Sequence, residues 1–153
     1  FPNQRGFVGG SMGDDSVILQ GAESSIPLDE DFDQIDVDFG GEGGNAPLAQ
    51  VNALFSTVHG AGRVMSRTEA AGKLNRKTGK RITHGKITHL DMQTWLENKG
   101  VILRGGGLDE APQAYRRLSE VLSAQGDTIE VLHTLRPLIV VMAGDTEFDP
   151  YKD

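Results

Sequence analysis

The chain has 153 residues, the length of a single domain, and a formal net charge of −7. It contains no cysteine, which excludes a disulfide framework, thiolate metal sites and a cysteine nucleophile. No run approaches the roughly 18 apolar residues of a membrane span, and the first residues lack the layout of a signal peptide. We therefore expect a soluble, cytoplasmic protein without a membrane partner.

The charges are unevenly distributed along the chain. Residues 14–42 contain ten acidic side chains and no lysine or arginine, whereas residues 62–90 contain eight basic side chains and one acid. We interpret residues 21–47 as an exposed acidic loop excursion, in which the alternation over 35–39 indicates a short edge strand. The basic stretch is the part that an anionic partner such as RNA would contact. Clustered positive charge steers an anionic ligand toward the protein and releases the counterions of that ligand on binding.

The pattern of apolar residues predicts a mixture of helices and strands. Residues 7–13 are typical of a short apolar segment entering a glycine turn, and residues 47–58 allow helix or extended chain. The remaining elements, in chain order, are a buried strand over 16–20, a helix over 63–74, a helix over 88–98, a strand over 101–103, a helix over 109–124 and strands within 128–141, interrupted at Pro137. Because no regular βαβ rhythm is present, we expect an α+β fold with mixed sheet layers and flanking helices.

The helix over 88–98 has the clearest local signals. Thr88 is followed three residues later by Asp91, which is typical of a capped helix start, and Lys99-Gly100 is typical of a helix end. We expect the apolar side chains of this helix to share its buried side; they are Leu90, Trp95 and Leu96.

Standard nucleotide and metal motifs are missing from the sequence. It contains no G-x-x-x-x-G-K-[ST], no G-x-G-x-x-G and no H-E-x-x-H pattern. His84 and His89 are five residues apart, or about 140° around a helix, so they do not share a helical face. We expect both to be solvent-exposed loop and cap residues, and we assign no metal ligand in this chain.

Residues 57–67 (TVHGAGRVMSR) combine a histidine, small residues and two arginines. The small residues would let an anion approach the backbone N–H groups closely; they are Gly60, Ala61 and Gly62. A helix beginning near Arg63 would direct its positive end toward that anion, and Arg63 and Arg67, four residues apart on one face, could bind phosphate oxygens. His59 could attack a phosphorus centre and form a phosphoramidate. From these residues alone, a structural histidine before a helix is an equal alternative.

A second motif is the glycine turn of residues 9–16 (GGSMGDDS). The hydroxyl groups of Ser11 and Ser16 flank this turn and could hydrogen-bond a base edge or a ribose. An ordinary turn at the entry to a strand explains the pattern as well.

Three segments in order, GGSMGDDS, STVHGAGRVMSR and GLDEAPQAYR, resemble the C-terminal third of the RtcB family of RNA-splicing ligases. The family patterns are PGSMG-x-x-S, HGAGR and DE-x-P-x-AY, and the resemblance runs from about Gly9 to Val141. It implies that residues 1–153 are the C-terminal portion of an RtcB-like ligase domain with an RtcB-like fold.

The resemblance also implies an activity and roles for individual residues. Members of this family use GTP and Mn²⁺ to join RNA 3′-phosphate or 2′,3′-cyclic phosphate ends to 5′-hydroxyl ends. His59 matches the histidine that becomes linked to GMP, and Arg63 matches an arginine expected on the reacting phosphate. Ser11 and Ser16 match serines that contact guanine, and Tyr115 matches a tyrosine placed against the guanine ring.

The chain departs from the family pattern at several points. Gly10 replaces the proline of the turn, and Met142 stands where the family commonly has a lysine that reaches guanine. The acidic excursion is longer than the family leads us to expect. The manganese ligands of the family come from upstream, so we expect them outside this chain, in a missing upstream part or a complementing chain, and expect the isolated chain to be inactive. The alternative is a non-catalytic RNA- or nucleotide-binding module.

Overall fold

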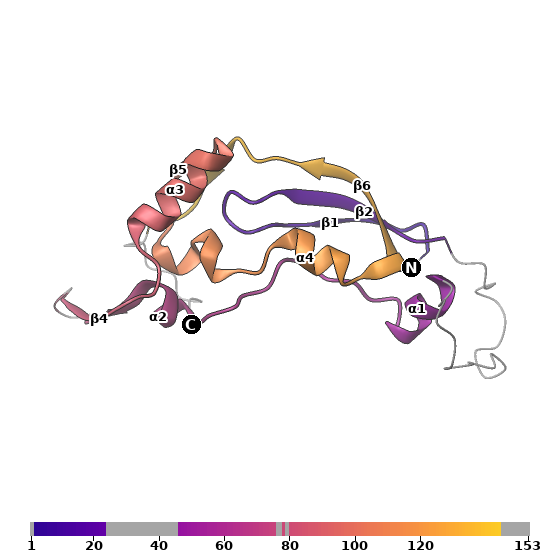
Figure 1. Cartoon of the computed structure of the whole chain (residues 1–153), viewed down its shortest axis with the longest axis horizontal. Coiled ribbons are helices and arrows are strands. Elements are labelled where there is room, and N and C mark those ends of the chain that lie inside the picture. The colour runs from indigo at the N-terminus through magenta and orange to yellow at the C-terminus, as the bar shows by residue number, and fades with distance from the viewer. Residues whose placement is uncertain (1, 24–45, 76–77, 79, 145–153) are drawn as a thin grey trace.

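A computed structural model of the chain describes residues 2–23, 46–75, 78 and 80–144. Its largest sheet is antiparallel and three-stranded, in the order β1 (Arg5–Val8), β2 (Ser16–Gly21) and β6 (Ile129–Leu135). Figure 1 shows this sheet running along the middle of the molecule, with the helices around it. No helix in the described part is long and apolar enough to cross a membrane.

The other elements are short. The helices are α1 (Ala46–Asn52), α2 (Arg67–Ala71), α3 (His89–Lys99) and α4 (Leu118–Ser123). In the described part, three single 3₁₀ turns accompany them, at Leu108–Glu110, Pro112–Ala114 and Gly126–Thr128. An antiparallel hairpin is formed by β3 (Gly72–Leu74) and β4 (Arg81–His84), and a parallel pair by β5 (Ile102–Arg104) and β7 (Ile139–Val141). The described part is thus α+β, as expected.

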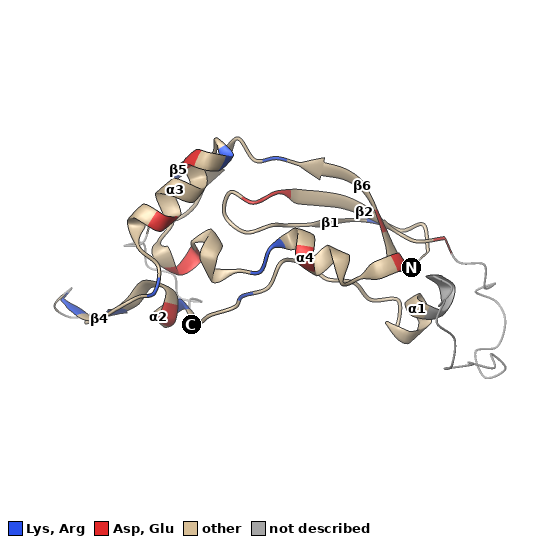
Figure 2. Cartoon of the chain, viewed as in Figure 1, with Lys and Arg blue, Asp and Glu red and all other residues tan. Residues whose placement is uncertain are grey.

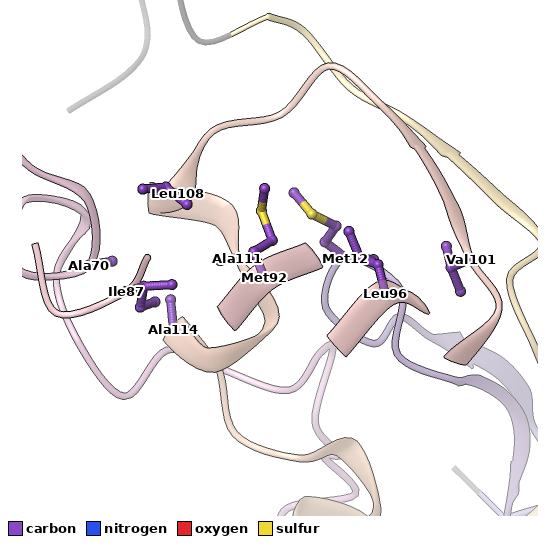
Figure 3. Close-up of a cluster of buried hydrophobic side chains, with 9 residues drawn as sticks. All are labelled: Met12, Ala70, Ile87, Met92, Leu96, Val101, Leu108, Ala111 and Ala114. Atoms are coloured by element: carbon purple, nitrogen blue, oxygen red, sulfur yellow. The ribbon is translucent and has the colours of Figure 1, made fainter. Parts of the chain in front are cut away.

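Two hydrophobic clusters hold these elements together. The first packs the glycine turn, α2, α3 and the turns before α4 (Figure 3); its buried members are Met12, Ala70, Ile87, Met92, Leu96, Val101, Leu108, Ala111 and Ala114. The second lies against one face of the three-stranded sheet, and its buried members are Val8, Val17, Leu19, Ala61 and Leu118. Each of the three sequence motifs contributes to a cluster, through Met12, Ala61 and Ala114 respectively, so the motifs are anchored by burial.

Several predicted elements are confirmed. The strand expected at 16–20 is β2, the strand at 101–103 appears one residue later as β5, and the interruption at Pro137 separates β6 from β7. Residues 7–13 leave β1 for a turn, and α1 resolves the first half of the ambiguous stretch 47–58 as helix. The edge strand expected over 35–39, and residues 24–45 of the acidic excursion, lie outside the described residues.

Helix α3 confirms the helix predicted over 88–98 and corrects its buried side. The Thr88 hydroxyl accepts a hydrogen bond from the Asp91 N–H, and the Asp91 carboxylate accepts one from the Thr88 N–H, which completes a capping box. The buried residues are Met92 and Leu96, four apart on one face, whereas Leu90 is 72% exposed. Leu90 precedes Met92 by two positions and therefore lies on the opposite side of the helix.

The helix predicted over 63–74 is wrong over most of its length. Only Arg67–Ala71 is helical, because Arg63 is paired in extended conformation with Tyr115 and Ser66 caps the helix start. Gly72 has a φ of 84° and ends the helix. A Cβ at Gly72 would lie 2.3 Å from the Thr83 carbonyl oxygen, so the close approach of β4 requires glycine there.

The helix predicted over 109–124 is also wrong in its first half. Two 3₁₀ turns stand there, and only Leu118–Ser123 is α-helical. Pro112 supplies the reason, since it has no N–H to donate and disfavours helical geometry in the preceding residue. Ala111 accordingly has a φ of −59° and a ψ of 149°.

Candidate functional site

The glycine turn and the histidine segment lie side by side. Gly9 and Gly60 form an isolated parallel bridge, which brings residues 9–16 next to the residue that follows His59. Within the turn, the Gly10 N–H donates to Ser16 Oγ at 3.2 Å. A Cβ at Gly10 would lie 2.2 Å from the Asp15 carbonyl oxygen, so this conformation excludes the proline that the family pattern has here.

The inner side of the glycine turn is fixed by packing. Gly13 has a φ of 73°, and a Cβ there would lie 2.6 Å from a methyl group of Leu96. Asp14 is mostly buried and pairs with Lys99 at 3.4 Å. The hydroxyl oxygen of Ser11 is buried and has no hydrogen-bond partner among the described residues. A buried hydroxyl without a partner is costly, so this atom is available to a ligand that reaches the turn.

His59 stands in an exposed segment between two anchored positions. Its side chain is exposed and forms no hydrogen bond or ion pair within the described part of the chain. Ala61 is buried in the second cluster, and the Gly62 carbonyl accepts from the Arg116 N–H at 2.9 Å. The backbone around His59 is therefore held while the imidazole is exposed to solvent.

Arg63 is engaged by neighbouring protein groups. Its Nε donates to the Met65 carbonyl at 3.1 Å, its Nη1 to the Tyr115 hydroxyl at 2.8 Å and its Nη2 to the Asp109 carbonyl at 2.5 Å. Its guanidinium carbon also lies 4.7 Å from the centre of the Tyr115 ring. Arg63 and Tyr115, two of the predicted site residues, are thus in direct contact.

Glu110 joins the two arginines, and the sequence analysis did not assign it a role. Its carboxylate accepts a hydrogen bond from Arg67 Nε at 3.1 Å and lies 3.0 Å from Arg67 Nη2 and 3.5 Å from Arg63 Nη1. It also accepts a hydrogen bond from the Tyr115 hydroxyl. Asp109 adds a longer contact of 3.7 Å to Arg67. The signal that could have found this pair is the acidic dipeptide that opens the segment GLDEAPQAYR.

The surroundings of Tyr115 keep its hydroxyl protonated. Burial is the main cause that raises the pKa of Tyr115 above its ordinary value of 10.0, and the charge of Glu110 raises it further. The positive charge of Arg63 acts in the opposite direction. The protonated hydroxyl therefore both donates to Glu110 and accepts from Arg63.

The predicted residues fall into two groups. Ser11, Ser16 and the segment 59–62 are brought together by the main-chain bridge, and Arg63 joins Tyr115 by side-chain contacts. The expected helix start at Arg63 is wrong, because α2 begins at Arg67. The two arginines therefore meet at Glu110 and do not share a helical face.

The histidines and acids of the described part do not form a metal site. Within residues 2–23, 46–75, 78 and 80–144, no group of three or more His, Cys, Asp or Glu side chains could hold a metal ion. His84 and His89 are both exposed, His84 on strand β4 and not in a loop, and His89 as the first residue of α3. The residues present thus do not fit a manganese site.

Comparison with known proteins places this arrangement in a ligase family. A family model described as tRNA-splicing ligase RtcB matches residues 44–143, so the chain belongs to the RtcB family. The RNA-splicing ligase RtcB of Escherichia coli K12 is 30% identical over 138 residues, which are 90% of this chain and 24% of that protein. The RNA-splicing ligase RtcB of Mycobacterium tuberculosis is 40% identical over 76 residues, 47% of this chain and 15% of that protein. The chain therefore spans a minor part of the length of these relatives.

Proposed function

We propose that this chain is the C-terminal, nucleotide-accepting portion of a cytoplasmic, GTP- and Mn²⁺-dependent RNA ligase. The ligase would join RNA 3′-phosphate or 2′,3′-cyclic phosphate ends to 5′-hydroxyl ends. The observation that carries the proposal is the bridge between Gly9 and Gly60. This bridge sets the Ser11 hydroxyl, which has no hydrogen-bond partner among the described residues, in the turn beside the segment that bears the exposed His59. Membership of the RtcB family supports it independently.

In the proposed reaction a ring nitrogen of His59 attacks the α-phosphorus of GTP. A phosphorus–nitrogen bond forms, the bond from that phosphorus to the bridging oxygen breaks, pyrophosphate leaves and the imidazole loses a proton. A 2′,3′-cyclic phosphate end is first opened by water to a 3′-phosphate. The guanylyl group then passes to an oxygen of the RNA 3′-phosphate, the phosphorus–nitrogen bond breaks and His59 is freed. The 5′-hydroxyl oxygen attacks this activated phosphate and gives up its proton, so that the RNA phosphodiester forms and GMP leaves. Because the described residues do not fit a manganese site, we assign the metal ligands to residues elsewhere.

The guanosine contacts are assigned to the turn and to Tyr115. A buried hydroxyl such as that of Ser11 can donate to and accept from a base edge, and Ser16 lies at the other end of the same turn. The Tyr115 ring offers a stacking surface, and stacking of a base is worth about 1–3 kcal/mol. The side chain of Met142 is half-buried against the first cluster and has no N–H to donate, so guanine selection must rest on other residues.

The phosphate contacts are assigned to residues 60–62 and to Arg63. A guanidinium has five N–H donors, and the protein groups around Arg63 do not occupy all of them, since Nη2 uses one of its two. One donor therefore remains for a phosphate oxygen without breaking the contact to Tyr115. Arg63 would act from a position that Tyr115 and Glu110 already fix.

The proposal is tested by guanylylation of a chimaera in which this sequence replaces the matching stretch of the E. coli relative. Incubation with α-³²P-labelled GTP and Mn²⁺ should give an acid-labile adduct that is lost in His59→Ala. His89→Ala, which removes another exposed histidine, is the matched control and should keep the adduct. An adduct that persists in His59→Ala, or no adduct on the chimaera, would contradict the proposal.

A non-catalytic RNA-binding module is the second candidate, and the β3–β4 hairpin favours it. Lys73, Lys80 and Arg81 are exposed there, and Figure 2 shows basic residues along the ribbon near the label of β4. A binding module would retain single-stranded RNA in a salt-dependent manner and form no GMP adduct. Filter binding in parallel with the labelling experiment separates the two functions.

A further inference from the structure

The parallel pair of β5 and β7 has two largely apolar faces, and only one of them is packed against other described residues. Ile102 pairs with Ile139 and Arg104 with Val141. The side chains between them, Leu103 and Val140, are half-buried against the first hydrophobic cluster. Neighbouring residues along a strand point to opposite faces, so the register divides the sheet into an inner and an outer face.

The outer face is apolar and open. Ile102 is 49% exposed, Ile139 60% and Val141 76%. Arg104 is the one charged member of this face in the described strands. We call Ile102, Arg104, Ile139 and Val141 the outer β5–β7 face.

General rules for sheets make this exposure informative. Parallel sheets are nearly always covered on both faces, and their strands read as continuous apolar runs such as residues 139–141. Neither β5 nor β7 pairs with a third strand within the described part, so each also has an open backbone edge. A parallel pair of strands with apolar faces and two unpaired backbone edges is typical of the interior of a larger sheet or layered fold.

The length of the relatives indicates what covers this face. The chain aligns over 90% of its residues with 24% of the E. coli protein, so most of that protein has no counterpart here. We infer that the outer β5–β7 face is the docking surface for this remaining part of the RtcB ligase, in the same polypeptide or in a complementing chain.

The surface also specifies the chemistry of its partner. Three of its four side chains are apolar, so the docked segment must present apolar side chains to them. Arg104 already donates to the Leu103 carbonyl at 3.2 Å, and its remaining N–H groups need further acceptors once water is excluded, because burying an uncompensated charge is strongly unfavourable. We therefore expect a carboxylate or a carbonyl group opposite Arg104.

The test measures association of this chain with the E. coli RtcB part that lies outside the matched stretch, produced separately. Ile139→Lys should weaken association by about tenfold or more, because the lysine would be buried without a partner. Leu54→Lys is the control: Leu54 is 83% exposed and follows α1, which lies at the other end of the molecule from α3 and β5 (Figure 1). Its affinity should stay within about twofold of the original chain.

A labelling experiment complements the affinity measurement. The chain has no cysteine, so Val141→Cys and Leu54→Cys each carry a single thiol. Binding of the E. coli part should slow maleimide labelling at 141 and leave labelling at 54 unchanged. Equal affinities of the two lysine variants, undiminished labelling at 141, lack of association, or self-association that alone covers position 141 would each overturn the inference. Association needs neither GTP nor His59, so its failure is distinct from failure of the proposed reaction, which is tested in a covalent chimaera.

Discussion

Replacing Glu110 by glutamine removes the charge that connects the two arginines and the tyrosine of the candidate site. The change keeps the shape of the side chain and one acceptor oxygen. Arg63 retains its bonds to the Met65 and Asp109 carbonyls, whereas the 3.7 Å contact to Asp109 becomes the one ion pair that Arg67 keeps among the described residues. The loss therefore falls on charge-assisted bonds that are partly shielded from water, since the Glu110 side chain is 20% exposed.

The expected magnitude follows from the geometry of these bonds. Hydrogen bonds to charged groups contribute about 1.5–3 kcal/mol when buried, and exposed ion pairs about 0–1 kcal/mol. The Arg67 side chain is 41% exposed, so its ion pair with Glu110 counts as an exposed ion pair. The hydrogen bond from the Tyr115 hydroxyl to Glu110 counts as a buried bond to a charged group. We expect Glu110→Gln to lower the free energy of unfolding by about 1–2 kcal/mol, between these two limits.

The assay is urea unfolding followed by the fluorescence of Trp95, the single tryptophan, which is half-buried against the first cluster. Glu120→Gln is the matched control, because it removes one negative charge from the exposed side of α4 and should change stability by less than about 0.5 kcal/mol. In addition, the pKa of Tyr115 should fall toward 10.0 in Glu110→Gln, since a neighbouring charge that raises it is gone. Equal stabilities of the two variants and an unchanged tyrosine titration would refute the reasoning.

Two further predictions concern the glycine turn and the dependence on pH. Gly13→Ala should lower the free energy of unfolding more than Gly100→Ala. Both glycines have a positive φ, but only at Gly13 does an added Cβ meet a Leu96 methyl group, at 2.6 Å. Urea unfolding of the two variants measures the difference. The ion pair with Lys86 holds the pKa of Glu69 below its ordinary value of 4.5, so its stabilisation is present above pH 4.5 and disappears as the pH falls through the lowered pKa. Glu69→Gln should remove this part of the acid dependence, and an identical pH profile of unfolding would contradict it.

Elements defined by local signals were predictable from the sequence. The Thr88–Asp91 pair marks the start of α3 and Gly100 marks its end, and the apolar run of β2 indicates a strand by its composition. The helix predicted over 109–124 passes over a local signal, Pro112, whereas the helix predicted over 63–74 is wrong for a reason that no local pattern contains. Arg63 is held in extended conformation by a partner in the segment 107–116, and this tertiary pairing outweighs a modest helix propensity.

The residues of the candidate site were predictable from the sequence, but the contacts between them were not. The motifs named Arg63 and Tyr115, yet only the structure shows that Glu110 bonds to both, and to Arg67 over a separation of 43 residues. Likewise, spacing along the chain predicted a phosphate clamp of two arginines on one helix, whereas the fold directs both toward a carboxylate. The roles of His59, Ser11 and Ser16 stay predictions for the guanylylation experiment.

The strands on the two sides of Pro137 have a consequence for synthesis of the chain. β6 completes the three-stranded sheet and β7 pairs with β5, so one short ribbon, residues 129–141, supplies the last strand of two sheets. A nascent chain that ends before residue 129 has neither sheet complete, and its exposed strand edges are open to wrong partners. Translation must therefore run through this ribbon before either sheet can close, and a pause just ahead of it would prolong the aggregation-prone stage.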